Sequence, residues 1–269
     1  MMNQGRTSMP FRNLLAGLLL FLVVTPIVSK SQVVGLDNWY NRETSPKTGQ
    51  LFHYLWTDTE NSGYSQWGDL FKKEGATLAT LGEAASKKNL SKLDVYIIVD
   101  PDTTTEAKSP NYIQPSDIKA ISSWVKKGGV LVLMANDAPN CEFTHLNLLA
   151  AEFGIHFNHV SLHPVVNHQW NMGAFINLPD HPMFKGVSKI YLKEISSFTL
   201  KTPAKSILTE NGIVFMTESR VGKGLVVAIG DPWIYNEYMD HAYLPADFEN
   251  KKAAINFTDY LLKNSRKRK

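Results

Sequence analysis

Val95-Tyr96-Ile97-Ile98-Val99 and Val130-Leu131-Val132-Leu133-Met134 are the two stretches of this sequence that decide its fold. Each is continuously apolar or aromatic, which is the pattern of a strand buried on both faces of a parallel sheet. Between them, Pro115 begins a segment that carries Ile121 and Trp124 at helical spacing, and proline is favoured in the first turn of a helix. Two buried strands joined by an amphipathic helix predict a parallel α/β unit.

The alternation of strands and helices continues on both sides of this unit. Strands are predicted at 33–37, 51–56, 77–81, 212–216 and 225–229, and helices near 62–75, 115–127, 142–153 and 246–262. This order predicts an α/β fold with a doubly wound, mostly parallel sheet, in which ligands bind at the carboxyl ends of the strands. Residues 155–205 are rich in His, Pro and Asn and interrupt the alternation. We expect them to form a small β-rich or irregular insertion, with a strand at 190–200, in a domain that covers 32–262.

The N-terminus has the pattern of a secretory signal. Arg6 and Arg12 precede an apolar run from Leu14 to Val24, and small residues lie at Ser29 and Ser31. A basic start, an apolar core of about 7–15 residues and a small-residue exit are typical of a signal peptide. The run is short for a bilayer span, which needs about 20 apolar residues. We therefore predict a signal peptide at 1–31, a periplasmic or secreted protein and no stable membrane span after cleavage, with an uncleaved N-terminal anchor as the alternative.

The charge of the chain depends on the two ends. The formal net charge is +3, and removal of residues 1–31 takes away Arg6, Arg12 and Lys30 without any acidic residue, which brings it to 0. The basic tail at 263–269 holds five of the remaining cations, so the body of the domain is mildly acidic. A nucleic-acid partner is therefore not expected, since such proteins gather positive charge on one face.

Polar side chains follow four of the predicted strands at the point where each strand ends. They are Asp37, Asn38 and Trp39; Asp100 and Asp102; Asn136 and Asp137; and Asp231 and Trp233. Because the carboxyl ends of the strands form the functional edge of a doubly wound sheet, this set predicts a substrate-binding rim. Alternatively, Asp and Asn at such positions cap helices and build turns.

Two further residues join the candidate site from the helix that follows the strand at 130–134. Glu142 and His145 are three residues apart and share one helix face, so His145 is placed with the substrate-binding set. If the domain is an enzyme, Asp137, Glu142 and Asp231 are the candidate catalytic carboxyl groups. No cofactor is expected and no metal site is assigned, because the histidines of the middle segment lack a ligand pattern.

The stretch 124–154 has the order helix, Gly-Gly turn, apolar strand, Asn136-Asp137 corner and helix, and Gly222-Lys223-Gly224 and Gly230-Asp231 follow later. Together these stretches resemble the class I glutamine amidotransferase-like superfamily. The stretches 36–41, 57–63, 99–102, 134–142 and 230–238 more narrowly resemble the domain attached to unsaturated rhamnogalacturonyl hydrolases (glycoside hydrolase family 105) in Bacteroidetes. The resemblance implies an amidotransferase-like, flavodoxin-like fold and work near pectin-derived sugars. The cysteine nucleophile of true amidotransferases is missing from the strand-to-helix turn, where Ala135-Asn136-Asp137 lies instead. Cys141 comes later, and its neighbour Glu142 would raise the pKa of a thiol, so a cysteine amidotransferase mechanism is not expected.

Three functions follow from this sequence and its resemblance. The first is an exported, carbohydrate-associated domain that binds or helps to process uronate-containing, pectin-type oligosaccharides, alone or beside a carbohydrate-active enzyme. The second is a carboxylate-dependent glycoside hydrolase of the same substrates, related to the unsaturated rhamnogalacturonyl hydrolases. The third is a non-catalytic scaffold or interaction module.

Overall fold

The computed structural model describes residues 1–2, 5, 31–45, 47–239 and 243–265. The predicted signal peptide at 1–31 lies almost entirely outside the described residues, and so does most of the basic tail. Within the described part, no helix is both long and apolar enough to cross a membrane.

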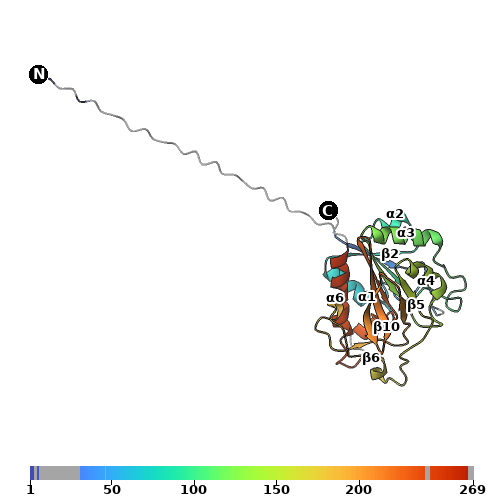
Figure 1. The fold of residues 1–269 in the computed structure, drawn as a ribbon. Coiled ribbons are helices and arrows are strands. Elements are labelled where there is room, and N and C mark those ends of the chain that lie inside the picture. Colours follow the sequence, from blue (N-terminus) through green and yellow to red (C-terminus); the bar gives the residue numbers. More distant parts are fainter. Residues whose placement is uncertain (3–4, 6–30, 46, 240–242, 266–269) are drawn as a thin grey trace.

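A large sheet runs through the centre of the domain, with helices on both of its faces (Figure 1). Its strands are β1 (Val33–Asp37), β2 (Thr77–Leu81), β3 (Val95–Val99), β4 (Val130–Met134), β5 (Ile155–Phe157), β8 (Phe198–Leu200), β9 (Lys205–Glu210), β10 (Ile213–Val221) and β11 (Gly224–Ile229). They lie in the order β2-β1-β3-β4-β11-β10-β8-β5, and β9 pairs with β10. The first five strands of this order are parallel, and the pairs beyond β11 are antiparallel. This confirms the predicted doubly wound, mostly parallel sheet, whose parallel part has the strand order of flavodoxin-like folds.

The helices divide between the two faces of the sheet. They are α1 (Ser65–Lys73), α2 (Lys87–Leu90), α3 (Pro115–Lys126), α4 (Phe143–Ala151), α5 (Asn236–Met239) and α6 (Asn250–Asn264). Alternate residues of β3 explain the division: Val95, Ile97 and Val99 pack with α1 and α6, whereas Tyr96 and Ile98 pack with α2, α3 and α4. Every residue of β3 and β4 is buried, which is why their sequences are continuously apolar.

Residues 155–205 do not form a separate β insertion. β5 and β8 lie at the far edge of the main sheet, where they pair with each other and β8 pairs with β10. Only β6 (Ala174–Phe175) and β7 (Ile190–Tyr191) form a second sheet, beside the 3-10 turns η1 (Trp170–Gly173) and η2 (Pro182–Phe184). The strand predicted at 190–200 is therefore wrong over 192–197, where the chain bends between the two sheets.

The strand predicted at 51–56 is also wrong. Leu51 forms an isolated bridge with Thr44, and the chain then turns through His53 and Tyr54, whose φ angles are 63° and 51°. Tyr54 and Trp56 are nevertheless buried in the core of the α1 and α6 face. The apolar residues that suggested a strand therefore pack into the core from an irregular loop.

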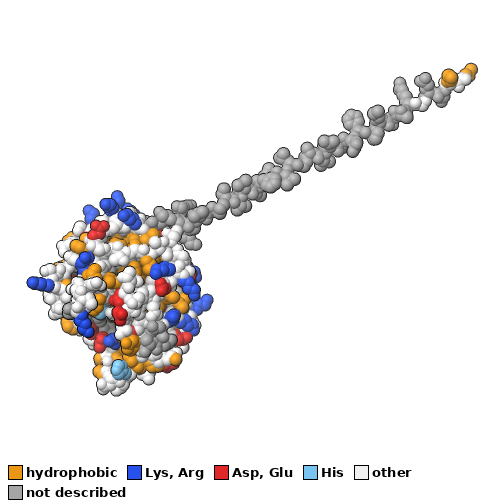
Figure 2. Space-filling model, turned by 180° about the vertical axis from the view of Figure 1, so that it is seen from behind, with side chains coloured by type: hydrophobic (Ala, Val, Ile, Leu, Met, Phe, Trp, Pro, Cys, Tyr) orange, Lys and Arg blue, Asp and Glu red, His pale blue; other side chains and the backbone are white. Residues whose placement is uncertain are grey.

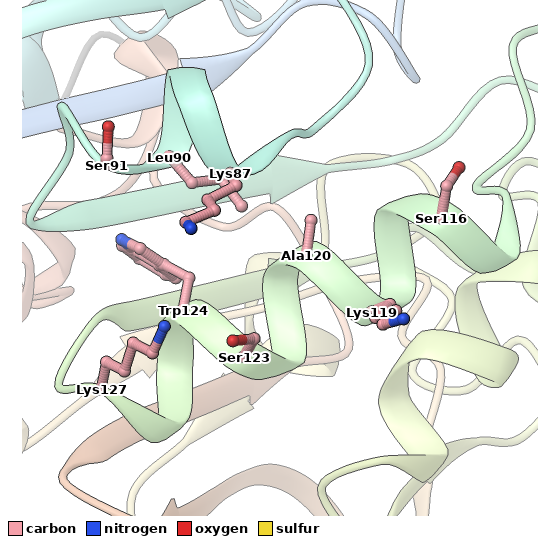
Figure 3. A pocket seen from close by; sticks show the side chains of 9 residues that line it. All are labelled: Lys87, Leu90, Ser91, Ser116, Lys119, Ala120, Ser123, Trp124 and Lys127. Carbon is pink, nitrogen blue, oxygen red and sulfur yellow. The ribbon is translucent and has the colours of Figure 1, made fainter.

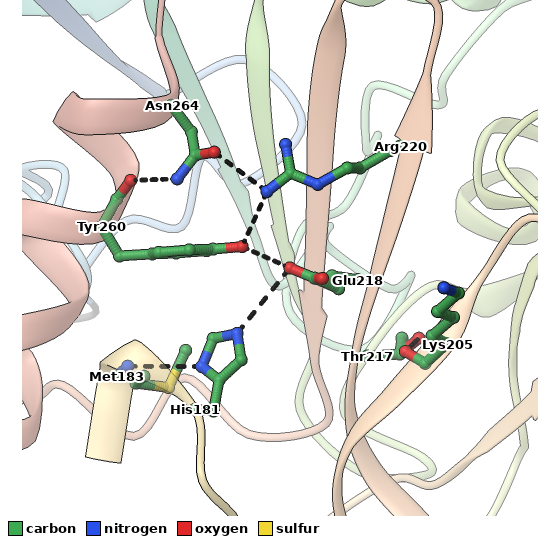
Figure 4. Close-up of polar contacts among 8 residues, drawn as sticks. All are labelled: His181, Met183, Lys205, Thr217, Glu218, Arg220, Tyr260 and Asn264. Carbon is green, nitrogen blue, oxygen red and sulfur yellow. Dashed lines mark hydrogen bonds and ion pairs between the residues drawn. The ribbon is translucent and has the colours of Figure 1, made fainter. Parts of the chain in front are cut away.

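A polar network fastens η2 and α6 to β10 (Figure 4). The Tyr260 hydroxyl donates to a carboxylate oxygen of Glu218 at 2.5 Å, and the same oxygen lies 3.8 Å from Nε2 of His181. These contacts hold the pKa of Glu218 below its usual value, with His181 as the largest cause. Arg220 extends the network by donating to Tyr260 and to Asn264.

Candidate functional site

A small polar pocket opens at the carboxyl ends of β4 and β11. It encloses about 180 Å³, and we call it the inner pocket. Its lining residues come from four loops and from α5: His53, Tyr54, Ser62, Asn136, Lys193, Glu194, Asp231, Tyr235, Glu237 and Tyr238. Doubly wound folds bind ligands at this edge of the sheet. Of the residues predicted for the site, Asn136 and Asp231 line this pocket.

Asp231 is the carboxyl group of the inner pocket that is buried, whereas Glu194 and Glu237 are half-buried. It follows β11 and is 3% exposed, and the backbone N–H of Lys193 donates to one of its oxygens at 2.8 Å. Burial raises the pKa of Asp231 to about 8. At neutral pH this carboxyl group is therefore mostly protonated and can donate a hydrogen bond or a proton.

Asp100 lies behind the pocket wall and ties two lining residues together. The Tyr54 hydroxyl donates to one of its oxygens at 2.8 Å, and the backbone N–H of Asn136 donates to the other at 3.1 Å. Burial raises the pKa of Asp100 well above its usual value. Asp100 thus positions Tyr54 and Asn136 and does not itself line the pocket, although the sequence predicted it as a substrate-binding residue.

Strained backbone surrounds the inner pocket. His53, Tyr54 and Glu194 line it with φ angles of 63°, 51° and 49°, and Asp100 behind them has a φ of 45°. A side chain in this left-handed region costs about 1–3 kcal/mol and persists only where the surroundings impose it. Here backbone hydrogen bonds impose it, from Tyr54 to Ser62 at 3.0 Å and from Glu194 to His163 at 3.1 Å. Such strain gathers at binding and catalytic sites.

The β1 end of the same edge uses its polar groups differently. Asp37 accepts hydrogen bonds from the Tyr96 hydroxyl at 2.6 Å and from the backbone N–H groups of Trp39 and Tyr40. Burial raises its pKa to about 6. The Asn38 amide donates to the carbonyl of Asn41 at 3.1 Å. These residues shape the loop after β1, as in the capping and turn alternative, and none of them lines the inner pocket.

Asp102 also serves this loop. One of its oxygens accepts from the backbone N–H of Arg42 at 2.8 Å, and burial raises its pKa to about 7. The charges of Glu106 and Asp37 add to this rise. Burial, together with Glu106 and Asp102, raises the pKa of Glu43 to about 7. Within the described residues, no group of three or more His, Cys, Asp or Glu side chains is arranged to hold a metal ion.

Asp137, Glu142 and His145 build the start of α4 and lie outside the lining of the inner pocket. Asp137 is buried and accepts from the Asn140 amide at 2.8 Å. Glu142 caps the helix by accepting from the backbone N–H of His145 at 2.9 Å, and its second oxygen lies 3.1 Å from Nδ1 of the same histidine. Asp137 and Glu142 therefore do not line the inner pocket with Asp231, although Asp137 lies near enough to add to the rise in the pKa of Asp231.

Neither Trp233 nor Cys141 lines the inner pocket. Trp233, expected at the rim, is fully buried and packs against Phe257 of α6, because the chain turns inward after Asp231. Cys141 is 3% exposed, and burial raises the pKa of its thiol well above the usual value. A buried neutral thiol is a poor nucleophile.

Several lining residues were missed from the sequence. Lys193 and Glu194 fall inside the segment that was predicted as one strand, and His53 and Tyr54 fall inside another. Tyr235 and Glu237 follow Asp231 within six residues, and that proximity to a strand end was the one signal that could have found them.

A second cavity, of about 360 Å³, lies between α2 and α3 (Figure 3). Lys87, Lys119 and Lys127 stand around it, and Trp124 and Leu90 close its floor. Lysine and arginine side chains also mark the top of the molecule in Figure 2, the end at which these helices lie. All of its lining residues belong to α2 and α3 or to their ends, and none of them was predicted for the site. This cavity is therefore separate from the carboxyl edge of the sheet.

Comparison with known proteins supports the fold. No family model and no curated protein sequence matches this chain. Among solved structures, the mmIFT52 N-terminal domain has a TM-score of 0.64 at 12% identity, over 86% of this chain and 97% of that one. Cytoplasmic protein STM3548 from Salmonella typhimurium has a TM-score of 0.55 at 15% identity, over 88% and 100% of the two chains. A cold-adapted beta-galactosidase from Rahnella sp. R3 has a TM-score of 0.53 at 13% identity, over 87% of this chain but only 31% of that one. At these identities the likeness concerns the fold alone.

Proposed function

We propose that this protein is an exported carbohydrate-binding domain whose inner pocket holds one sugar unit. The observation that supports this most is the pocket itself, in which Asn136 and Asp231 meet Tyr54, Tyr235 and Glu237 at the functional edge of the sheet. Carboxyl, amide and phenol groups are the hydrogen-bonding partners that a polyhydroxylated ligand needs. The enclosed 180 Å³ is smaller than the roughly 300–1,000 Å³ of sites for drug-sized ligands, which suits a single sugar unit.

Export belongs to the same proposal and rests on the sequence of residues 1–31. The resemblance to domains attached to rhamnogalacturonyl hydrolases supports pectin-type glycans as ligands. On the same resemblance we also propose that the flavodoxin-like fold is of the amidotransferase-like type. Cell fractionation with N-terminal sequencing tests the export: we expect a periplasmic or secreted protein that starts near Gln32.

The binding test is a thermal-shift and calorimetric screen of the exported protein against neutral and uronate-containing saccharides. We expect at least one saccharide to bind, and we expect Asp231→Ala, which removes the carboxyl group from the pocket, to weaken that binding by tenfold or more. Asp69→Ala is the matched control, since Asp69 is exposed on α1, where it pairs with Lys72 at 2.9 Å. Failure of every saccharide to bind, or equal binding by the two variants, would contradict the proposal and would favour a scaffold module.

One observation favours hydrolysis as a second candidate function. Asp231, mostly protonated at neutral pH, shares the inner pocket with the carboxyl groups of Glu194 and Glu237. Glycosidases use one protonated and one ionised carboxyl group, about 5–9.5 Å apart, on either side of the scissile bond. In this candidate Asp231 is the proton donor, and Glu194 or Glu237 is its partner in place of Asp137 and Glu142. Product analysis of the bound saccharides, with Asp231→Asn and Glu237→Gln beside the wild type, tests it.

A further inference from the structure

A wider cavity of about 430 Å³ lies next to the inner pocket, and we call it the outer cavity. Lys193, Glu237 and Tyr238 line both. The remaining wall of the outer cavity includes Trp170 and Tyr191. The two cavities therefore adjoin at these three residues. We call them together the groove, with the smaller inner pocket at one end and the larger outer cavity at the other.

Trp170 gives the outer cavity a fixed aromatic surface. It is half-buried at the start of η1, and its ring stands against Tyr191 with the centroids 5.6 Å apart and the planes at 75°. The turn before it carries strained backbone, with φ angles of 52° at Asn167 and 55° at His168. An immobilised aromatic ring offers a large contact area at a low entropic cost.

The charged side chains that line the groove disfavour an anionic ligand. Lys193 is paired with Glu194 at 3.3 Å, and Glu237 adds a carboxylate that both cavities share. Asp231 is uncharged at neutral pH because burial raises its pKa to about 8. A carboxylate on the ligand would therefore lie beside protein carboxylates without an unpaired cation among the lining residues, and like charges in contact repel.

We infer that the ligand is an uncharged oligosaccharide that spans both cavities, with its terminal unit in the inner pocket and the next unit packed on Trp170. This inference rests on the proposed carbohydrate-binding function. The apolar C–H face of the second unit packs against the indole ring. Uronate-containing chains, which the family resemblance implies as ligands, bind more weakly than their neutral counterparts.

Calorimetry with two matched saccharide ladders tests this inference. One ladder contains neutral mono-, di- and trisaccharides of galactose, glucose, mannose, xylose and arabinose, and the other contains galacturonic acid and its di- and trimers. We expect affinity to rise at least tenfold from mono- to disaccharide in a neutral series, and galacturonate binding to be at least tenfold weaker than galactose binding of equal length.

Two variants separate the outer cavity from the inner pocket. Trp170→Ala should remove the gain with chain length while leaving monosaccharide affinity within twofold, and Trp170→Phe should keep most of the gain.

The outcomes distinguish the inference from the proposed function. Monosaccharide binding with no gain for longer chains, or a uronate preference, overturns the inference and leaves the carbohydrate pocket standing. Absence of binding across both ladders overturns the two together.

Discussion

The carboxyl edge of the sheet carries acidic side chains along its whole length, yet the β1 half and the β4–β11 half use them in opposite ways. Asp37 in the first half is surrounded by donors that belong to the protein, namely Tyr96 and two backbone N–H groups. Asp231 in the second half accepts one backbone N–H and borders a cavity. Equal placement at strand ends therefore does not give equal roles, because the following loop decides whether the carboxyl group meets protein or open space.

The largest expected effect in this comparison is on stability in the β1 half. Asp37→Ala removes the acceptor of three hydrogen bonds, two of them buried and the one from Trp39 partly buried, and unsatisfied buried donors cost about 1–3 kcal/mol each. We expect the free energy of unfolding, measured in urea, to fall by at least about 3 kcal/mol. Asp37→Asn keeps one acceptor oxygen and should lose clearly less. Wild-type stability of the alanine variant would show that the two halves do not differ as described.

The second effect concerns the pH dependence of stability, and it belongs to Asp231. Its folded pKa, about 8, lies above the 3.8 of an ordinary Asp, so its contribution is fully present below pH 3.8 and is lost as the pH rises through about 8. The slope is at most about 1.4 kcal/mol per pH unit for one proton. We expect Asp231→Asn to flatten the urea-unfolding profile between pH 5 and 9.

Asp69→Asn is the control for that profile and should leave it unchanged. Because the asparagine oxygen can still accept from Lys193, the Asp231→Asn variant should be more stable than the wild type at pH 9. A wild-type slope that survives in Asp231→Asn would assign the pH dependence to other groups.

The smallest expected effect concerns the hydrogen bond between Asp100, which follows β3, and Tyr54 in the wall of the inner pocket. Tyr54→Phe removes the hydroxyl that donates to Asp100 at 2.8 Å and should lower the free energy of unfolding by about 1–2 kcal/mol. Tyr112→Phe is the control, since the ring of Tyr112 stacks on His145 and should tolerate the loss of its hydroxyl. If the two variants lose equal stability, Asp100 does not position Tyr54 through this bond.

The sequence predicted the frame of the fold well because its strands are buried on both faces. The ranges predicted for β1, β2, β3 and β4 coincide with the observed ones, since a continuous apolar run between turn residues leaves little room for another structure. The strand at 51–56 and the middle of the strand at 190–200, over 192–197, were predicted wrongly. Their apolar residues pack into the core from irregular loops, and periodicity cannot distinguish such residues from a short strand.

The candidate site could be predicted only in part, for the same reason. Strand ends placed Asn136 and Asp231 on the functional edge, and both line the inner pocket. Which polar residue faces a cavity depends on the loops at 53–54 and 193–194, whose left-handed residues are neither Gly nor Asn. Nothing in the local sequence marks His53 or Glu194 for that conformation, because hydrogen bonds to distant segments impose it.

Because Cys141 is buried, the reactivity of its thiol can report local opening of the structure. It is the single cysteine in the sequence, and it lies between the Asp137 turn and the Glu142 cap, on the same edge as the inner pocket. A thiol with a raised pKa and almost no solvent contact reacts only when the surrounding structure opens. The rate at which a thiol reagent modifies the native protein therefore measures how often the start of α4 separates from the sheet, and a ligand that slows the reaction stabilises that edge.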